Sequence, residues 1–231
     1  MTARRVVVTG ANRGLGFGLV DAFIRTGMRV IAVARDPETA RLQELRDRYP
    51  HQLESVGADV TDDSSVATAA RAIGAPIDLL VNNAGINPGP RNDLDGLDFD
   101  DARAAFEVNV LGVLRVTRQL LPALLESSSP VLVHVTSKMG SIGMNDAGGA
   151  LAYRMSKAAL NMAHQNLTLD LGARGVTCVV VHPGWVRTDM VGPDATLSID
   201  DSVSKLVPMI SSFDRAAHGR FFDVSGEEIP W

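Results

Sequence analysis

Seven short apolar runs alternate along the chain with longer segments in which apolar residues recur at helical spacing. The runs are continuous in Val, Ile and Leu, as expected for parallel strands covered on both faces. The predicted strands are Arg5–Thr9, Arg29–Ala34, Leu53–Asp59, Ile77–Asn82, Val131–Thr136, Val176–His182 and Arg220–Val224. The predicted helices are Leu15–Thr26, Pro37–Tyr49, Asp63–Ile73, Asp101–Glu126 and Leu151–Gly172. This alternation predicts a doubly wound α/β fold with right-handed crossovers.

The chain carries no internal repeat, low-complexity tract or Pro/Gly-rich linker, so we predict one domain over residues 1–231. Two stretches depart from the alternation. The polar, turn-rich Asn87–Leu97 is predicted to be a surface loop, and Thr188–Asp201 a short irregular segment. The acidic run that begins at Asp93 could suggest a metal site, but it fits better as solvated charge at a helix start capped by Asp98. We expect no metal site.

Composition and charge exclude several classes of partner. The net charge of −5 is mixed in sign and gives no basic footprint for nucleic acid. The single cysteine, Cys178, excludes an intramolecular disulfide and a cysteine-built zinc site, and its apolar run predicts a buried thiol. No apolar stretch approaches the roughly 20 residues needed to span a bilayer, and a strand pattern from Val6 leaves no room for a secretory signal. We expect a cytoplasmic protein without a membrane or nucleic-acid partner.

A glycine-rich turn follows the first predicted strand, in the stretch VVVTGANRGLGFG at residues 6–18. Gly10, Gly14 and Gly16 stand between that strand and a predicted helix, where backbone N–H groups and the positive helix end can bind the pyrophosphate of a dinucleotide. Alone, such a turn is equally consistent with a tight turn of no special purpose, and T-G-x-x-x-G-x-G differs from the general G-x-G-x-x-G. Gly18 is predicted to allow close packing of the helix on the strand.

Two arginines indicate which dinucleotide is bound. An acidic residue at the end of the second strand would bond the free ribose 2′-OH of NAD and repel a 2′-phosphate. That strand ends instead in Ala34 followed by Arg35, and Arg13 stands within the glycine turn. Because a guanidinium is a planar fork suited to phosphate, these residues favour NADP(H). The neighbouring Asp36 precedes Pro37 and is predicted to cap a helix.

Further motifs follow in order along the whole chain. They are Thr9–Gly16 (TGANRGLG), Asp59-Val60, Asn82–Gly85 (NNAG), Asn109, Ser137, Tyr153–Lys157 (YRMSK) and Pro183-Gly184. Together they resemble the short-chain dehydrogenase/reductase family, which implies a single-domain Rossmann-like parallel sheet of about seven strands. The stretches MGSIG, YRMSKAALNM and HPGWVRTDM and the tail GRFFDVSGEEIPW resemble the C-factor/sniffer-like carbonyl reductase branch of that family.

Four side chains suit the reduction of a carbonyl, whose oxygen gains negative charge and needs a proton. Tyr153 is expected to donate that proton, and Lys157, one helical turn later, to lower the tyrosine pKa from its ordinary value of about 10. Ser137, directly after a predicted strand, is expected to hydrogen-bond the substrate oxygen. Ser141 stays an alternative, because Ser137 lies farther from Tyr153 than the family spacing implies. By resemblance, Asn109 is the fourth catalytic residue and holds a water that relays protons towards Lys157.

The resemblance also implies which residues contact the cofactor, with Lys157 holding the nicotinamide ribose and the segment after the sixth strand lining the nicotinamide. The expected NADP(H) contacts are Gly10, Asn12, Arg13, Gly14, Leu15, Gly16, Arg35, Asp59, Val60, Asn83, Ala84, Gly85, Tyr153, Lys157, Pro183, Gly184, Val186 and Thr188. His134 and His182, in or at the ends of apolar strands, are predicted to be structural.

The function favoured by this sequence is an NADPH-dependent reductase of small aldehydes, ketones or quinones. Two alternatives stay open: an NADP(H)-bound signalling or regulatory protein of C-factor type, and an enzyme with one dedicated substrate. The short Thr188–Asp201 segment predicts an open pocket that accepts varied carbonyls. Apolar residues around most of the helix Leu151–Leu171 predict a possible homodimer.

Overall fold

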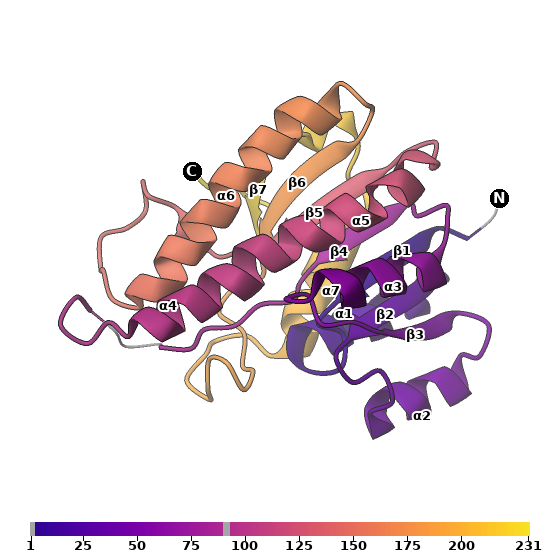
Figure 1. The fold of residues 1–231 in the computed structure, drawn as a ribbon, viewed down its shortest axis with the longest axis horizontal. Helices are drawn as coiled ribbons and strands as arrows, with labels where there is room; N and C mark the ends of the chain where they lie inside the picture. Colours follow the sequence, from indigo (N-terminus) through magenta and orange to yellow (C-terminus); the bar gives the residue numbers. More distant parts are fainter. Residues whose placement is uncertain (1–2, 90–92) are drawn as a thin grey trace.

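The computed structural model describes residues 3–89 and 93–231. Within these ranges, seven strands form one parallel sheet in the order β3-β2-β1-β4-β5-β6-β7 (Figure 1). The strands are β1 Arg5–Thr9, β2 Arg29–Ala34, β3 Leu53–Gly57, β4 Leu79–Asn82, β5 Val131–Val135, β6 Thr177–His182 and β7 Phe221–Asp223. The predicted fold class is confirmed. Five of the predicted strands extended one or two residues beyond the observed bounds at one or both ends.

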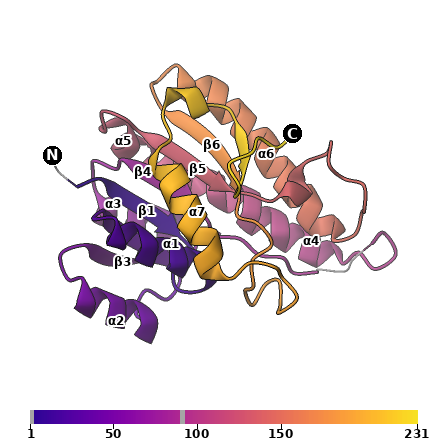
Figure 2. The same cartoon turned by 180° about the vertical axis from the view of Figure 1, so that it is seen from behind.

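Helices cover both faces of the sheet. One face carries α1 (Gly14–Arg25), α2 (Ala40–Arg48) and α7 (Ile199–Ser211), as Figure 2 shows. The other face carries α3 (Asp63–Ile73), α4 (Phe99–Phe106), α5 (Val113–Leu125) and α6 (Leu151–Gly172). Alternate strand residues point to opposite faces, so Val6 and Val8 lie in the apolar cluster under α1 and α7, whereas Val7 lies in the cluster under α3 and α5.

Helix α7 was absent from the prediction, which treated Thr188–Asp201 as irregular. The helix begins at Ile199 behind a capping box in which Ser198 and Asp201 bond each other's backbone. It packs on α1, and a Cβ built on Gly18 would lie closer than 3.0 Å to the Ile199 side chain. Gly18 therefore permits close packing of α1 on α7 rather than on the strand, which corrects the sequence-based role.

The predicted helix 101–126 begins at Phe99 and contains a π-helical turn, Glu107–Gly112, between α4 and α5. Among the described residues, the continuous helix Phe99–Leu125 is the one helix long and apolar enough by composition to cross a membrane. From the sequence, no stretch of this length and apolarity was expected. Core helices of globular proteins pass the same test, and the buried side chains of α5 pack against the sheet through Val116, Leu120 and Leu124.

Two expected helix caps have different outcomes. Asp98 caps α4, because its carboxylate accepts from the backbone of Asp100 and Asp101, as predicted. Asp36 does not cap α2: it accepts from the Glu38 backbone, and the helix begins at Ala40 after Thr39. Residues 90–92 of the predicted loop 87–97 lie outside the described residues.

Candidate active site

The strand order reverses between β1 and β4, and in open α/β sheets the crevice at such a reversal is the binding site. Here the ends of the two strands are joined by side chains. The Thr9 hydroxyl accepts from the backbone of Asn83 and Ala84, each at 3.0 Å, and the Asn83 amide donates to the Thr9 carbonyl at 2.9 Å. The motif NNAG is thereby fixed against the glycine turn.

The glycine turn is shaped so that side chains are excluded from it. A Cβ on Gly16 would lie closer than 3.0 Å to the Gly10 carbonyl oxygen, and one on Gly10 would lie 2.9 Å from the Ala84 Cα. Gly10 and Gly14 have φ of 67° and 55°, values that L-residues rarely adopt. Helix α1 begins at Gly14 without a side-chain cap or an acidic first turn among the described residues. Its first N–H groups therefore suit an anionic ligand.

The residues expected to select the cofactor lie around this turn. Ala34 ends β2 and is buried, whereas Arg35 is exposed. The Arg13 guanidinium is also exposed and forms an ion pair with Asp189 at 3.1 Å. Thr188, next to Asp189, lies over the turn: a Cβ on Gly14 would be 3.7 Å from its methyl group. The segment after β6 thus lies against the turn through Thr188 and Asp189.

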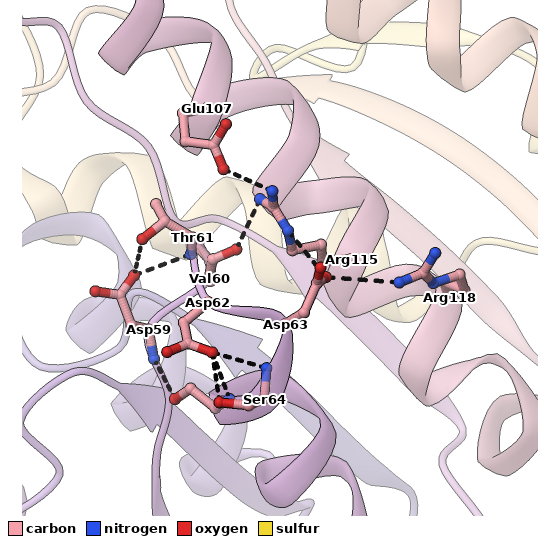
Figure 3. A network of polar contacts seen from close by, with 10 residues as sticks. Asp59, Val60, Thr61, Asp62, Asp63, Ser64, Glu107, Arg115 and Arg118 are labelled. Carbon is pink, nitrogen blue, oxygen red and sulfur yellow. Dashed lines mark hydrogen bonds and ion pairs between the residues drawn. The ribbon is translucent and has the colours of Figure 1, made fainter.

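The Asp59-Val60 motif after β3 is held by a polar network that joins it to α5 (Figure 3). Asp59 accepts from the Thr61 backbone and hydroxyl, which lowers the pKa of its carboxyl. Arg115 donates to the Val60 carbonyl at 3.4 Å. The same guanidinium pairs with Asp63 at 3.1 Å and Glu107 at 2.6 Å.

Tyr153, Ser137 and Lys157 come together beside the end of β5. The Ser137 hydroxyl lies close enough to the Tyr153 phenol to influence its pKa. The Lys157 ammonium lies 5.7 Å from the centre of the Tyr153 ring and donates to the Val135 carbonyl at 3.1 Å. Ser137 follows the end of β5 after one intervening residue, Thr136, close to its predicted position at the strand end.

The protonation states differ from those expected. Burial raises the pKa of Tyr153 to about 12, opposed in part by the hydrogen bond from Ser137. Burial also lowers the pKa of Lys157 to about 8. Lys157 was expected to lower the tyrosine pKa; in the structure burial is the main cause of the shift and raises this pKa, so the effect of Lys157 stays a prediction.

Asn109 lies in the π-helical turn and is fully buried with its amide bonded. It accepts from the Ile86 backbone N–H and donates to the Ile86 carbonyl, each at 2.8 Å, and donates to the Ser156 hydroxyl at 2.9 Å. Ser156 in turn donates to the Tyr153 carbonyl at 2.8 Å. Asn109 thus ties the loop after NNAG to α6 one residue before Lys157. π-helical turns of this kind occur frequently at functional sites.

The other candidate serine, Ser141, is engaged elsewhere. Its hydroxyl donates to the Pro230 carbonyl at 2.6 Å and accepts from the Met144 backbone.

The segment after β6 closes the remaining side of the site. Gly184 has a φ of 84°, and Ser202 donates to the Pro183 carbonyl at 2.7 Å. A bridge between Val186 and Leu197 closes the loop.

Sequence reasoning missed several residues that shape the site. Arg115 holds Val60, and Gly112 allows the π-helical turn to approach Val60, which a Cβ would meet at 2.9 Å. Ser156 links Asn109 to Tyr153 and was also missed, although the YRMSK motif that contains it was noticed. Gly112 and Ser156 could have been noticed in the sequence. Their roles could not, because Val60 and Asn109 lie far away along the chain.

Comparisons with known proteins agree with this geometry. A family model described as short chain dehydrogenase matches residues 4–196. The C-signal protein of Myxococcus xanthus is 47% identical over 165 residues, 71% of this chain and 99% of that protein. NADPH-bound carbonyl reductase from chicken fatty liver has a TM-score of 0.90 at 32% identity, and the carbonyl reductase Sniffer of D. melanogaster 0.94 at 28%. Both alignments cover 100% of each chain. The chain belongs to the short-chain dehydrogenase family and is similar to its C-factor/sniffer-like branch.

Proposed function

We propose that the protein is an NADPH-dependent oxidoreductase that reduces the carbonyl group of small aldehydes, ketones or quinones. The observation that carries this proposal is the grouping of Tyr153, Ser137 and Lys157 at one place in the fold. These groups lie at the end of β5, on the same sheet edge as the glycine turn. A proton donor, an oxygen-binding hydroxyl and a cation therefore stand next to a dinucleotide crevice.

The glycine turn and its two arginines fit NADP(H). The first N–H groups of α1 would bind the pyrophosphate, and Gly10 and Gly16 leave room for the backbone to approach it. The exposed guanidinium groups of Arg13 and Arg35 would bind the 2′-phosphate, beside the neutral Ala34. Similarity to the NADPH-bound chicken carbonyl reductase supports the same choice.

When bound, the reduced nicotinamide supplies the hydride, and the chain supplies the proton and the charge stabilisation. With a pKa of about 12, the Tyr153 phenol is protonated at neutral pH and is ready to donate to a carbonyl oxygen that gains negative charge. The Ser137 hydroxyl would hydrogen-bond the same oxygen. Lys157, with a pKa of about 8, is still mostly charged at neutral pH and would stabilise the phenolate that remains. The Asn109 amide bonds fix the loop and helix that carry these groups.

The test is to follow NADPH and NADH consumption over a panel of aldehydes, ketones and quinones. We expect turnover of several substrates, with NADPH preferred. Arg35→Ala should raise the Kd for NADPH by about tenfold, the value of a charged hydrogen bond, and leave the Kd for NADH unchanged. A preference for NADH would contradict the roles of Arg13 and Arg35. Turnover of a single substrate would contradict the open pocket.

A second candidate, an NADP(H)-bound signalling protein, is favoured by the 47% identity to the C-signal of Myxococcus xanthus. It predicts that the protein binds NADPH but turns over no carbonyl in the panel. The grouping of Tyr153, Ser137 and Lys157 favours the enzyme, because binding alone would not require a proton donor beside the crevice.

We further propose that α6 forms a homodimer contact. Met155, Met162 and Leu169 recur every seven residues and are exposed on this helix. Such an apolar row on a surface helix is typical of subunit contacts. Light scattering on wild type and Leu169→Glu tests it: a dimer that becomes a monomer supports the contact, and a wild-type monomer contradicts it.

A further inference from the structure

The tail segment Pro230-Trp231 packs between β7 and α6, and both ribbon views place the chain end beside α6 (Figures 1 and 2). The Trp231 ring lies 5.4 Å from the ring of Phe221 in β7 and is stacked on His164 of α6 at 6.3 Å, centre to centre. Ile229, which donates its N–H to the Phe221 carbonyl, completes a small apolar cluster with Phe221 and Val180. The tail is thus seated on two elements of the fold.

From this seat, the tail holds the segment Ser141–Met144 through backbone oxygens. The Pro230 carbonyl accepts from the Ser141 hydroxyl at 2.6 Å, and the Trp231 carbonyl accepts from the Gly143 N–H at 3.2 Å. The Ser141 hydroxyl also accepts from the Met144 N–H at 3.2 Å. One serine side chain therefore connects the tail to both ends of the segment.

The same segment is joined to the catalytic groups on its other side. Ser137 and Ser141 flank a short 3₁₀ turn, Lys138–Gly140. Gly140 packs on the backbone of Lys157, where a Cβ would lie 2.8 Å away, and its carbonyl accepts from Asn161 of α6 at 3.1 Å. Because the turn is fixed at Gly140, the position of the chain after Ser141 depends on its bonds to the tail.

The segment presents apolar side chains to solvent shortly after Ser137 in the chain. Ile142 is 80% exposed and Met144 is 44% exposed. Ser141, which joins them to the 3₁₀ turn, is buried. Exposed apolar groups on a held loop at the edge of a catalytic site are suited to contact the apolar part of a ligand. Without the tail, these side chains would have no fixed position relative to Ser137.

We propose that Pro230-Trp231 is a positioning element for the substrate site: it holds Ser141–Met144 so that Ile142 and Met144 form a wall for the apolar part of the carbonyl substrate. This inference rests on the proposed reductase function. Trp231 acts through the segment and not on the reacting atoms. Its loss should therefore change substrate affinity, above all for substrates with a long apolar chain, and leave the chemical step and cofactor binding in place.

The experiment compares Trp231→Ala with Trp231→Phe and with Phe213→Ala as a matched control. Phe213 stacks on Phe222 at 5.5 Å on the opposite face of β7, so its removal costs a comparable ring contact without touching Ser141–Met144. For each protein, kcat and KM are measured with NADPH and either nonanal or propanal. NADPH affinity is measured by fluorescence, and hydrogen exchange of the Gly143 and Met144 amides is followed in the absence of substrate.

For Trp231→Ala we expect the KM for nonanal to rise about tenfold, with the KM for propanal, kcat and NADPH affinity changed by less than about twofold. The Gly143 and Met144 amides should exchange at least about tenfold faster, as expected for lost local protection. In Trp231→Phe, the KM for nonanal and the amide exchange rates should stay close to the wild-type values. Phe213→Ala should change neither quantity.

Three results would overturn the proposal: unchanged exchange at Gly143 and Met144 in Trp231→Ala, faster exchange without a change in the KM for nonanal, or the same KM changes in Phe213→Ala. If wild type turns over no carbonyl, the reductase function fails. The exchange measurement then still shows by itself whether the tail holds the segment.

Discussion

Three buried histidines lead us to predict that the free energy of unfolding of this protein depends steeply on pH. His134 of β5 and His164 of α6 contact each other through their Nδ1 atoms at 3.1 Å, and both are fully buried. His182, at the end of β6, is 6% exposed. Burial lowers the pKa of His164 to about 3, that of His182 to about 4, and that of His134 well below its ordinary value. All three are neutral in the folded protein at mildly acidic pH.

The sign and size of the effect follow from proton linkage. Below about pH 6.5 the unfolded chain binds protons at these histidines and the folded chain does not, so stability falls as pH falls. Between pH 7 and pH 5, each histidine lowers the free energy of unfolding by about 2 kcal/mol. The unfolded group takes up its proton below about pH 6.5, so it gains about 1.4 kcal/mol for each of the roughly 1.5 pH units down to pH 5. The three together should remove about 6 kcal/mol, a large part of the typical 5–15 kcal/mol of a domain.

The assay is urea unfolding at pH 7 and pH 5, at one protein concentration. His182→Asn removes one titrating group. The decrease in its free energy of unfolding between pH 7 and pH 5 should therefore be only about 4 kcal/mol, whatever its absolute stability. His51→Asn, at an exposed position, is the matched control and should keep the wild-type loss. A wild-type loss below about 2 kcal/mol, or an equal loss in His182→Asn, would refute the reasoning.

Two further predictions concern the glycine turn and its helix. Asp189→Asn frees Arg13 from its ion pair, so the Kd for NADPH should fall about two- to fivefold at low salt and that for NADH should not change; equal changes for both would contradict the competition for Arg13. Gly18→Ala should destabilise the protein by about 1–3 kcal/mol, because the new methyl meets Ile199 of α7. Adding Ile199→Ala should recover much of this loss in thermal unfolding, and strictly additive losses would show that the two positions do not compete for space.

Local sequence signals predicted the parts of the fold that depend on them. The helix Leu151–Gly172 has its predicted bounds, and Asp63–Ile73 likewise begins where Asp62 caps it. The pairing of the NNAG and TG motifs also agrees with the expected crevice, because parallel strands bring their carboxyl ends to one edge. Helix α7 was not predicted. Ile199, Val203 and Leu206 have the apolar spacing of a helix, but Pro208 interrupts the pattern.

The remaining features depend on contacts between residues far apart in the chain. Ser141 is bound by Pro230, 89 positions away, and this contact had no local signal, although the predicted strand before Ser137 already favoured that serine. The Tyr153 pKa is set by how much solvent the fold removes from the phenol, which the Tyr-x-x-x-Lys spacing does not indicate. Gly18 similarly meets a helix that the prediction lacked.

The central claim is that Tyr153 donates the proton in a reduction that consumes NADPH. The most direct measurement is the rate of NADPH oxidation by wild type and Tyr153→Phe with one turned-over aldehyde, together with the Kd for NADPH of both proteins. Loss of a general acid should lower kcat by about 100-fold or more, while the Kd for NADPH changes by less than about twofold. Equal turnover by Tyr153→Phe, or binding of NADPH without turnover by wild type, would contradict the account.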